Sequence, residues 1–256
     1  MMITEEQFRR IEGCFPTQRG NVTISNLQVL NAILYVAENG CKWRALPKRF
    51  GRWHTIYTRM NRWAKAGVLD RVFTALQEEE IIRINVETLS VDSTIVKVHP
   101  DGTGAGKKNG PQSIGRSRGG WTTKIHMVAA DARRAVTFSL SPGQHHDAPA
   151  GRELLRSLPP PQAPVSLIMD RAYEGDNTRQ LALDLGFTPV VPPKRGRLHP
   201  WSFDRMLYRR RNEIERLFRR LKGFRRIFSR FDKLDVMFTA FIHFALIAEG
   251  LRPRIV

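Results

Sequence analysis

The spacing of apolar residues changes near residue 81 and divides the chain into two parts. Before that point apolar residues recur every three or four positions and glycines interrupt them, which is typical of short helices. The predicted helical segments cover residues 24–37, 43–50, 52–66 and 68–76. A helix, a short segment, a turn at Gly51 and a basic polar helix form the pattern of a helix-turn-helix. The acidic run Glu78–Glu80 is expected to be a surface link.

After residue 81 the pattern changes to strands, and then to strands that alternate with helices. The predicted strands cover residues 88–99, 121–130, 135–140, 165–169 and 187–191. The predicted helices cover residues 147–158, 178–185 and 204–223, followed by an apolar C-terminal helix. The segment 101–120 is rich in glycine, lysine and arginine, which predicts a mobile loop. This order predicts an α/β domain with a mixed sheet over residues 81–256, preceded by a small all-α domain over residues 1–80.

The charge of the chain indicates a polyanionic partner. Its 256 residues include 42 lysines and arginines but only 24 aspartates and glutamates, which gives a net charge of +18. Double-stranded DNA is the first candidate partner and an anionic membrane surface the second. Residues 194–230 hold 14 basic and 3 acidic side chains, with aromatic residues between them. That mixture suits a folded element facing nucleic acid better than a loose basic tail.

Composition also excludes several classes of protein. The longest apolar stretch, residues 236–251, contains His243 and Glu249 and is too short to cross a bilayer. Two cysteines exclude a disulfide framework and a four-thiolate zinc site, and they fit a reduced cytosolic setting. The polar, acidic residues 1–10 do not form a signal peptide. A cytoplasmic protein without a membrane partner is therefore expected.

Two regions besides the basic C-terminal segment are candidates for binding DNA. Arg52, Arg59 and Arg62 lie on the predicted basic helix and would read DNA as a recognition helix does. The segment 104–120 carries four basic residues that either clamp DNA or are solvated, and both interpretations remain open. These four are Lys107, Lys108, Arg116 and Arg118.

Two aspartates occupy unusual positions in the predicted strands. Asp92 lies inside the first strand, and Asp170 ends another directly after three apolar residues. An unpaired charge there is costly, and two carboxylates side by side repel each other unless a cation lies between them. Hard oxygen ligands of this kind suit Mg²⁺ or Mn²⁺. Each aspartate alone would more simply be a surface or capping residue.

A third carboxylate is expected from the long basic helix. At about 100° per residue, Glu215 shares one helix face with Tyr208, Arg211 and Lys222. Glu213 instead lies among other arginines, as expected for a solvated partner in ion pairs. Glu215 is therefore the preferred metal ligand.

The ordered set of short motifs resembles the bacterial insertion-sequence transposases of the DDE class, of the IS-five type. The helix signature of that family is Tyr, two residues, Arg, three residues, Glu, six residues, Lys, and residues 208–222 fit every spacing. The resemblance covers nearly the whole chain. Its other matching segments are residues 40–47, 91–94, 115–120, 124–126, 143–147 and 170–175.

The resemblance implies a ribonuclease-H-like catalytic domain in which Asp92, Asp170 and Glu215 hold two divalent metal ions. It further implies that Arg211 and Lys222 contact phosphates near the cut and that Tyr208 supports the transposon end. Two ions can activate water and stabilise a leaving oxygen, and the freed 3′-hydroxyl can then attack target DNA. A homodimer is expected on the DNA. The His145-His146-Asp147 turn is more simply a hydrogen-bonded corner than a set of ligands.

Three rival interpretations remain. A non-enzymatic DNA-binding regulator leaves the acids and the helix signature unexplained. A metal-dependent nuclease of the same fold, which cuts without joining, is compatible with the sequence. A decayed, inactive element is the third, and the presence of all three acids argues against it. The terminal repeats, the target preference and the oligomeric state are not encoded in any motif of the chain.

Overall fold

The computed structural model describes residues 2–18, 20, 22–81, 86–104 and 110–252. The chain forms two compact units, each made of segments that are distant in the sequence. The sheet unit comprises Ile84–Val98 and Ser113–Arg220. The helical unit comprises Met1–Arg83, His99–Gln112 and Leu221–Val256.

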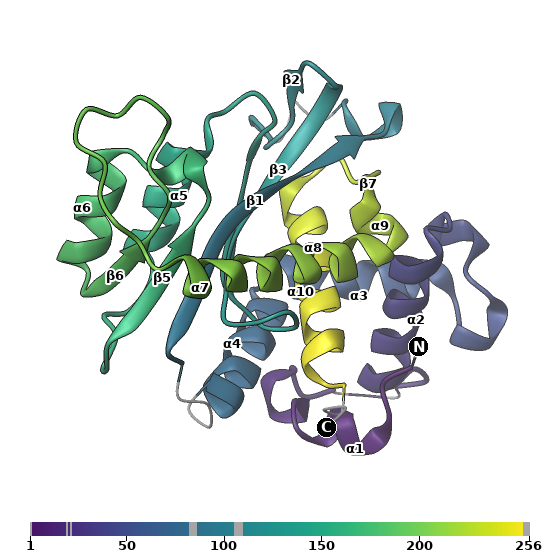
Figure 1. Cartoon of the computed structure of the whole chain (residues 1–256). Helices are drawn as coiled ribbons and strands as arrows, with labels where there is room; N and C mark the ends of the chain where they lie inside the picture. The colour runs from purple at the N-terminus through teal and green to yellow at the C-terminus, as the bar shows by residue number, and fades with distance from the viewer. Residues whose placement is uncertain (1, 19, 21, 82–85, 105–109, 253–256) are drawn as a thin grey trace. The chain divides into compact units, whose positions relative to one another are not determined.

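A mixed sheet forms the centre of the sheet unit (Figure 1). Its strand order is β2-β3-β1-β5-β6, and β4 pairs with β3 as well. β1 runs antiparallel to β3 and parallel to β5, and β6 is parallel to β5. The strands are β1 (Thr88–Val98), β2 (Gly115–Ser117), β3 (Gly120–Ala129), β4 (Ala135–Pro142), β5 (Val165–Met169) and β6 (Phe187–Val190). This order confirms the predicted α/β domain with a mixed sheet.

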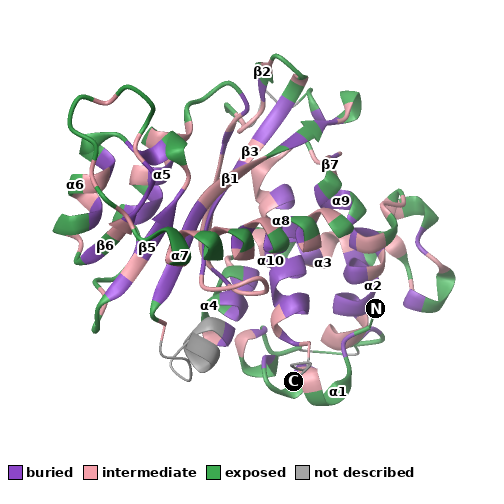
Figure 2. Ribbon diagram, in the orientation of Figure 1, coloured by how far each residue is buried: buried purple, intermediate pink, exposed green. Residues whose placement is uncertain are grey.

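Helices that follow the strands in the chain pack on the sheet. α5 (Asp147–Arg156) packs on β1, β3 and β4, and α6 (Asp176–Asp184) packs on β6. Beneath them lies an apolar core of leucine, valine and methionine side chains from β1, β5 and α5. α7 (Arg205–Tyr208), the 3-10 turn Arg209–Arg211 and α8 (Asn212–Gly223) follow β6, and the 3-10 turn contacts β5. Buried strand positions are visible along β1, β3 and β5 in Figure 2.

The helical unit is built around its most apolar helix, α10 (Asp235–Gly250). α10 packs against α2 (Asn26–Asn39), α3 (Trp53–Lys65) and α4 (Val68–Ile81), and its residues Met237 to Glu249 are nearly all buried (Figure 2). The remaining elements of the unit are α1 (Glu5–Arg9), α9 (Arg225–Phe228), β7 (Ser229–Arg230) and 3-10 turns at Glu12–Cys14, Trp43–Ala45, Lys48–Phe50 and Pro100–Gly102. The N-terminal helices therefore form one core with the C-terminal helix.

Local signals explain where α2 begins and ends. The Ser25 side chain accepts a hydrogen bond from the Gln28 N–H, which caps the first turn. Gly40 adopts a left-handed conformation, with φ of 67°, and closes the last turn. A side chain at Gly40 would be strained in that conformation and would press against Arg225, which follows α8. The predicted all-α character of this region is confirmed.

The structure differs from the predicted elements at three places. The predicted helix 204–223 is divided into α7 and α8 by the 3-10 turn Arg209–Arg211, where three arginines adjoin. α4 continues through the acidic run that was expected to be a surface link. The predicted loop 101–120 contains strand β2, because Gly115–Ser117 can pair with Gly120–Thr122 across a tight turn.

The predicted boundary near residue 80 divides a DNA-binding region from a catalytic region, and this division of function remains a prediction. Packing groups the chain differently, because the apolar face of α10 is covered by helices from residues 26–81. In the described part of the chain, none of the helices has both the length and the apolar character needed to cross a membrane.

Candidate active site

Asp92 and Asp170 lie side by side because of the register of two parallel strands. Val91 of β1 pairs with Met169 of β5, and this is the last position at which the two strands pair. Each aspartate directly follows its paired residue. The aspartates therefore lie where β1 and β5 separate. The carboxyl ends of parallel strands are a common place for ligand sites in such sheets.

Glu215 reaches the same place from the first turn of α8, and Arg211 links all three carboxylates. Arg211 Nη1 lies 2.9 Å from Asp92 Oδ2 and 3.4 Å from Asp170 Oδ2. Arg211 Nη2 lies 2.5 Å from Glu215 Oε1. Carboxylates from residues up to 119 positions away thus meet at the Arg211 guanidinium. Each of the three predicted acids is in this cluster.

Burial destabilises the charged form of the Asp92 carboxylate. Burial raises the pKa of Asp92 to about 6, although the N–H of Ser93 and the Arg211 guanidinium both lower it. The neighbouring Asp170 and Glu215 carboxylates raise the same pKa by repulsion. Burial alone would lower the pKa of Arg211, but the three carboxylates raise it overall. The cluster therefore requires a cation, and the guanidinium supplies that charge in this structure.

The donor set fits divalent metal ions in its chemistry. Asp92, Asp170 and Glu215 offer hard carboxylate oxygens, which Mg²⁺ and Mn²⁺ prefer. Among the described residues, no three acidic, histidine or cysteine side chains lie close enough together to hold one ion. The Arg211 guanidinium lies among the three carboxylates instead. Metal binding would therefore require the guanidinium to withdraw and the carboxylates to approach one another.

The other residues of the helix signature lie as follows. Tyr208 is half-buried at the end of α7, contacts Phe203 edge to face, and has a pKa that burial raises. Lys222 lies on α8 seven residues after Glu215, about two turns further along the same face. Glu213 accepts a hydrogen bond from the Ala132 N–H at 3.1 Å and lies 3.8 Å from Arg216. Glu213 is thus a structural contact of the turn between β3 and β4.

Not all of the basic segment 194–230 is available to DNA. Arg230 is fully buried and pairs with Asp235 at 2.7 Å, and Arg226 is buried and donates to the backbone oxygen of Cys41. Arg197 pairs with the buried Glu174 and lies over the Trp201 ring. Charge counting cannot separate these structural arginines from free ones. Exposed arginines remain at positions 195, 205, 209, 210, 216, 219 and 225.

Most of the other candidate DNA contacts in the described part of the chain are exposed, whereas Arg59 is half-buried. Arg52 and Arg62 are exposed at the start and on the last turn of α3. Arg59 is half-buried and donates to the backbone oxygen of Ile24 at 2.8 Å, which ties α3 to the start of α2. Arg116 and Arg118 are exposed on and beside β2. Lys107 and Lys108 lie outside the described residues.

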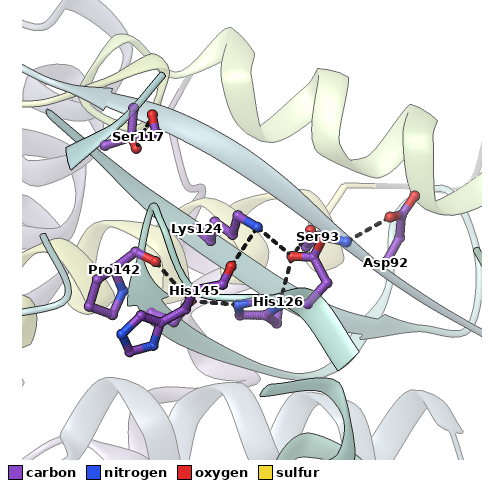
Figure 3. Close-up of polar contacts among 10 residues, drawn as sticks. Asp92, Ser93, Ser117, Lys124, His126, Pro142 and His145 are labelled. Atoms are coloured by element: carbon purple, nitrogen blue, oxygen red, sulfur yellow. Dashed lines mark hydrogen bonds and ion pairs between the residues drawn. The ribbon is translucent and has the colours of Figure 1, made fainter. Parts of the chain in front are cut away.

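Sequence reasoning missed a polar cluster on the other face of the sheet. Ser93, Lys124 and Asp147 form hydrogen bonds beside the buried His126 (Figure 3). The matched segment 143–147 pointed to this region, but its role could not be read from a local pattern. The contacts join β1, β3 and the first residue of α5.

The strand order, with one acid inside β1 and another directly after β5, places the protein in the class of ribonuclease-H-like enzymes. Two family models match this chain. "Putative transposase of IS4/5 family" matches residues 3–73, and "Transposase DDE domain" matches residues 87–248. The chain belongs to the DDE transposase family, because that second match covers more than half of its length.

Two curated relatives are similar to parts of this chain. An uncharacterised protein, y4sN of Sinorhizobium fredii, is 36% identical over 112 residues, which cover 42% of this chain and 86% of that protein. The putative transposase for insertion sequence element IS6501 of Brucella ovis is 32% identical over 132 residues. That alignment covers 51% of this chain and 99% of the relative.

Two solved transposase structures show weak similarity to this chain. The piggyBac transposase synaptic complex with hairpin DNA has a TM-score of 0.39 and 12% identity, over 77% of this chain and 50% of that chain. The Mos1 mariner paired end complex with Mn has a TM-score of 0.28 and 13% identity, over 72% and 65%. This chain thus spans about half to two thirds of those chains. At these scores the likeness is too weak to assign a role to any residue.

Proposed function

We propose that this protein is a DNA transposase that binds the ends of an insertion sequence, cleaves them and joins the 3′-hydroxyl ends to target DNA. The observation that carries the proposal is the meeting of Asp92, Asp170 and Glu215 at one cation where β1 and β5 separate. Family membership supports the same conclusion. A DNA-binding regulator would leave the meeting of three carboxylates at one guanidinium unexplained.

In this proposal the three acids hold two Mg²⁺ or Mn²⁺ ions. When bound, such ions activate water and stabilise the leaving oxygen of a phosphodiester. Arg211 neutralises the acids before that and, once released from them, contacts a phosphate of the DNA. Lys222 contacts a phosphate further along α8, and Tyr208 supports the transposon end. No side chain has to form a covalent bond to DNA.

The partners follow from the same chemistry. Double-stranded DNA is bound twice, as transposon end and as target, and pairing of two ends favours a homodimer on DNA. Arg52, Arg62, Arg116 and Arg118 are exposed side chains that support such binding. We expect the protein to act in the bacterial cytoplasm, on nucleoid DNA.

A strand-transfer assay tests the proposal against a nuclease of the same fold. The full chain is incubated with Mg²⁺, a pre-cleaved transposon end that carries a free 3′-hydroxyl, and a supercoiled plasmid. A transposase joins the end to the plasmid, and an end with a 3′-dideoxy terminus should give no product. Cleavage of uncut ends without any joining of pre-cleaved ends would show that the protein is a nuclease.

We predict that Arg62 and Lys222 affect DNA binding in different ways. Arg62→Ala should reduce the preference for transposon-end over scrambled duplex by about 1–3 kcal/mol, because base contacts carry sequence information. Lys222→Ala should leave that preference unchanged and reduce the salt slope of binding by about one unit, because phosphate contacts release counterions. Competition binding at several salt concentrations measures both quantities. The assignment of Arg62 is wrong if its variant lowers the salt slope and keeps the preference.

A further inference from the structure

Asp92 lies on a part of β1 that pairs with β3 on one side but no longer with β5 on the other. Pairing with β5 ends at Val91, while pairing with β3 continues through Ser93 and Thr94. The Ser93 N–H donates to the Asp92 carboxylate at 2.7 Å, so the position of Ser93 affects the direction in which that carboxylate points. What holds Ser93 therefore also helps to hold Asp92.

Successive side chains of a strand point to opposite faces of the sheet, so Ser93 points away from the acid cluster. On that face its hydroxyl donates to Asp147 Oδ1 at 2.9 Å. Figure 3 shows Ser93 between Asp92 and the polar cluster of Lys124 and His126. One contact thus reaches from α5 through β1 to the candidate metal ligand.

Asp147 is itself fixed from several sides. The Lys124 ammonium lies 2.9 Å from Asp147 Oδ1 and also donates to the backbone oxygen of His145 at 2.8 Å. Asp147 is the first residue of α5, where a negative charge is favoured by the helix dipole. Only 24% of its side chain is exposed, and 12% of that of Lys124. This is a built contact and not a loose surface pair.

Two further residues, His126 and Gly143, shape the surroundings of Asp147. His126 is fully buried, shares a 2.8 Å hydrogen bond with Ser141, and has a pKa that burial lowers to about 4, so its ring is neutral at pH 7. Gly143 lies so close to β3 that a Cβ there would be 3.0 Å from the backbone oxygen of Thr122. The absence of a side chain lets the loop pack on β3 and brings Asp147 to Ser93.

We propose that Asp147 is a positioning residue for Asp92. It fixes Ser93 from the opposite face of the sheet and so keeps the Asp92 carboxylate directed at the space shared with Asp170 and Glu215. The proposal rests on the proposed function, in which Asp92 is a metal ligand. Partners that orient metal ligands usually contribute about 10–100-fold to metal affinity.

The test measures Mn²⁺ binding to the full chain by the electron paramagnetic resonance signal of free Mn²⁺, without DNA or turnover. Ser93→Ala and Asp147→Ala should each weaken Mn²⁺ binding about tenfold, and the double variant should be no weaker than either, because both remove one contact. Ser93→Thr keeps the hydroxyl and should bind like the wild type. Ser157→Ala, which removes a hydroxyl contact to Leu154 at the end of α5, is the matched control and should also bind normally.

Thermal melting of each variant separates positioning from folding. Asp147→Ala leaves the Lys124 ammonium without this partner and should lower the melting temperature, whereas Ser93→Ala should change it little. Normal Mn²⁺ affinity in Ser93→Ala, or additive effects in the double variant, would overturn the proposal. Asp92→Asn separates the metal-ligand role of Asp92 from the positioning role of Asp147. If Asp92→Asn loses Mn²⁺ binding while Ser93→Ala binds normally, only the role of Asp147 is refuted. Normal binding in Asp92→Asn refutes the metal site and this inference together.

Discussion

Asp92→Asn, Asp170→Asn and Glu215→Gln are each expected to reduce Mg²⁺-dependent cleavage of a transposon end by at least about 10³-fold. Each change removes a charged oxygen ligand, and a bound metal ion supplies several kcal/mol of transition-state stabilisation. Binding of the uncut end should be retained, because each change lowers the negative charge that the DNA phosphates meet. Cleavage of a labelled end, with binding measured in parallel, checks both expectations.

Glu213→Gln is the matched control for Glu215→Gln on the same helix. Glu213 accepts the Ala132 N–H and does not contact Arg211, and a glutamine oxygen can accept the same hydrogen bond. This variant should keep most of the cleavage activity. Full cleavage by a variant of Asp92, Asp170 or Glu215 would remove that residue from the site.

Deletion of residues 1–81 is expected to unfold the helical unit. α10 is buried against α2, α3 and α4, and the deletion exposes its apolar side chains. Each fully buried leucine or phenylalanine contributes about 1.5–3 kcal/mol, so the loss exceeds the total stability of about 5–15 kcal/mol for a typical domain. The fragment 82–256 should aggregate or bind a hydrophobic dye in size-exclusion and fluorescence measurements.

Co-expression of residues 1–81 as a separate chain is the control for this deletion. If packing is the cause, the separate segment should restore the solubility of the fragment 82–256. A soluble, cooperatively folded fragment on its own would contradict the expectation. Charge considered without packing would instead predict that the same fragment binds DNA with little preference for the ends. Since the deletion also removes the cover of α10, point variants such as Arg62→Ala test end recognition more directly.

The sequence by itself determined the local features of the site. The apolar run before Asp170 predicts β5 with its observed ends, because a short apolar strand is specified by its own residues. The spacing from Tyr208 to Lys222 selected Glu215 over Glu213, and the structure brings Glu215 to the two aspartates. The alternation of strands and helices fixed the α/β class. Each of these depends on neighbours within a few turns or one strand.

Only the tertiary structure decided how distant segments meet. Arg211 lies 119 positions from Asp92 and Asp147 lies 54 from Ser93, and no periodicity encodes either contact. The position of α10 among the N-terminal helices likewise depends on which apolar faces fit together, not on the pattern of α10 alone. Burial then decided which arginines are structural, because Arg226 and Arg230 look like their exposed neighbours in the sequence. Local composition specifies elements, whereas packing between them selects the partners of each charge.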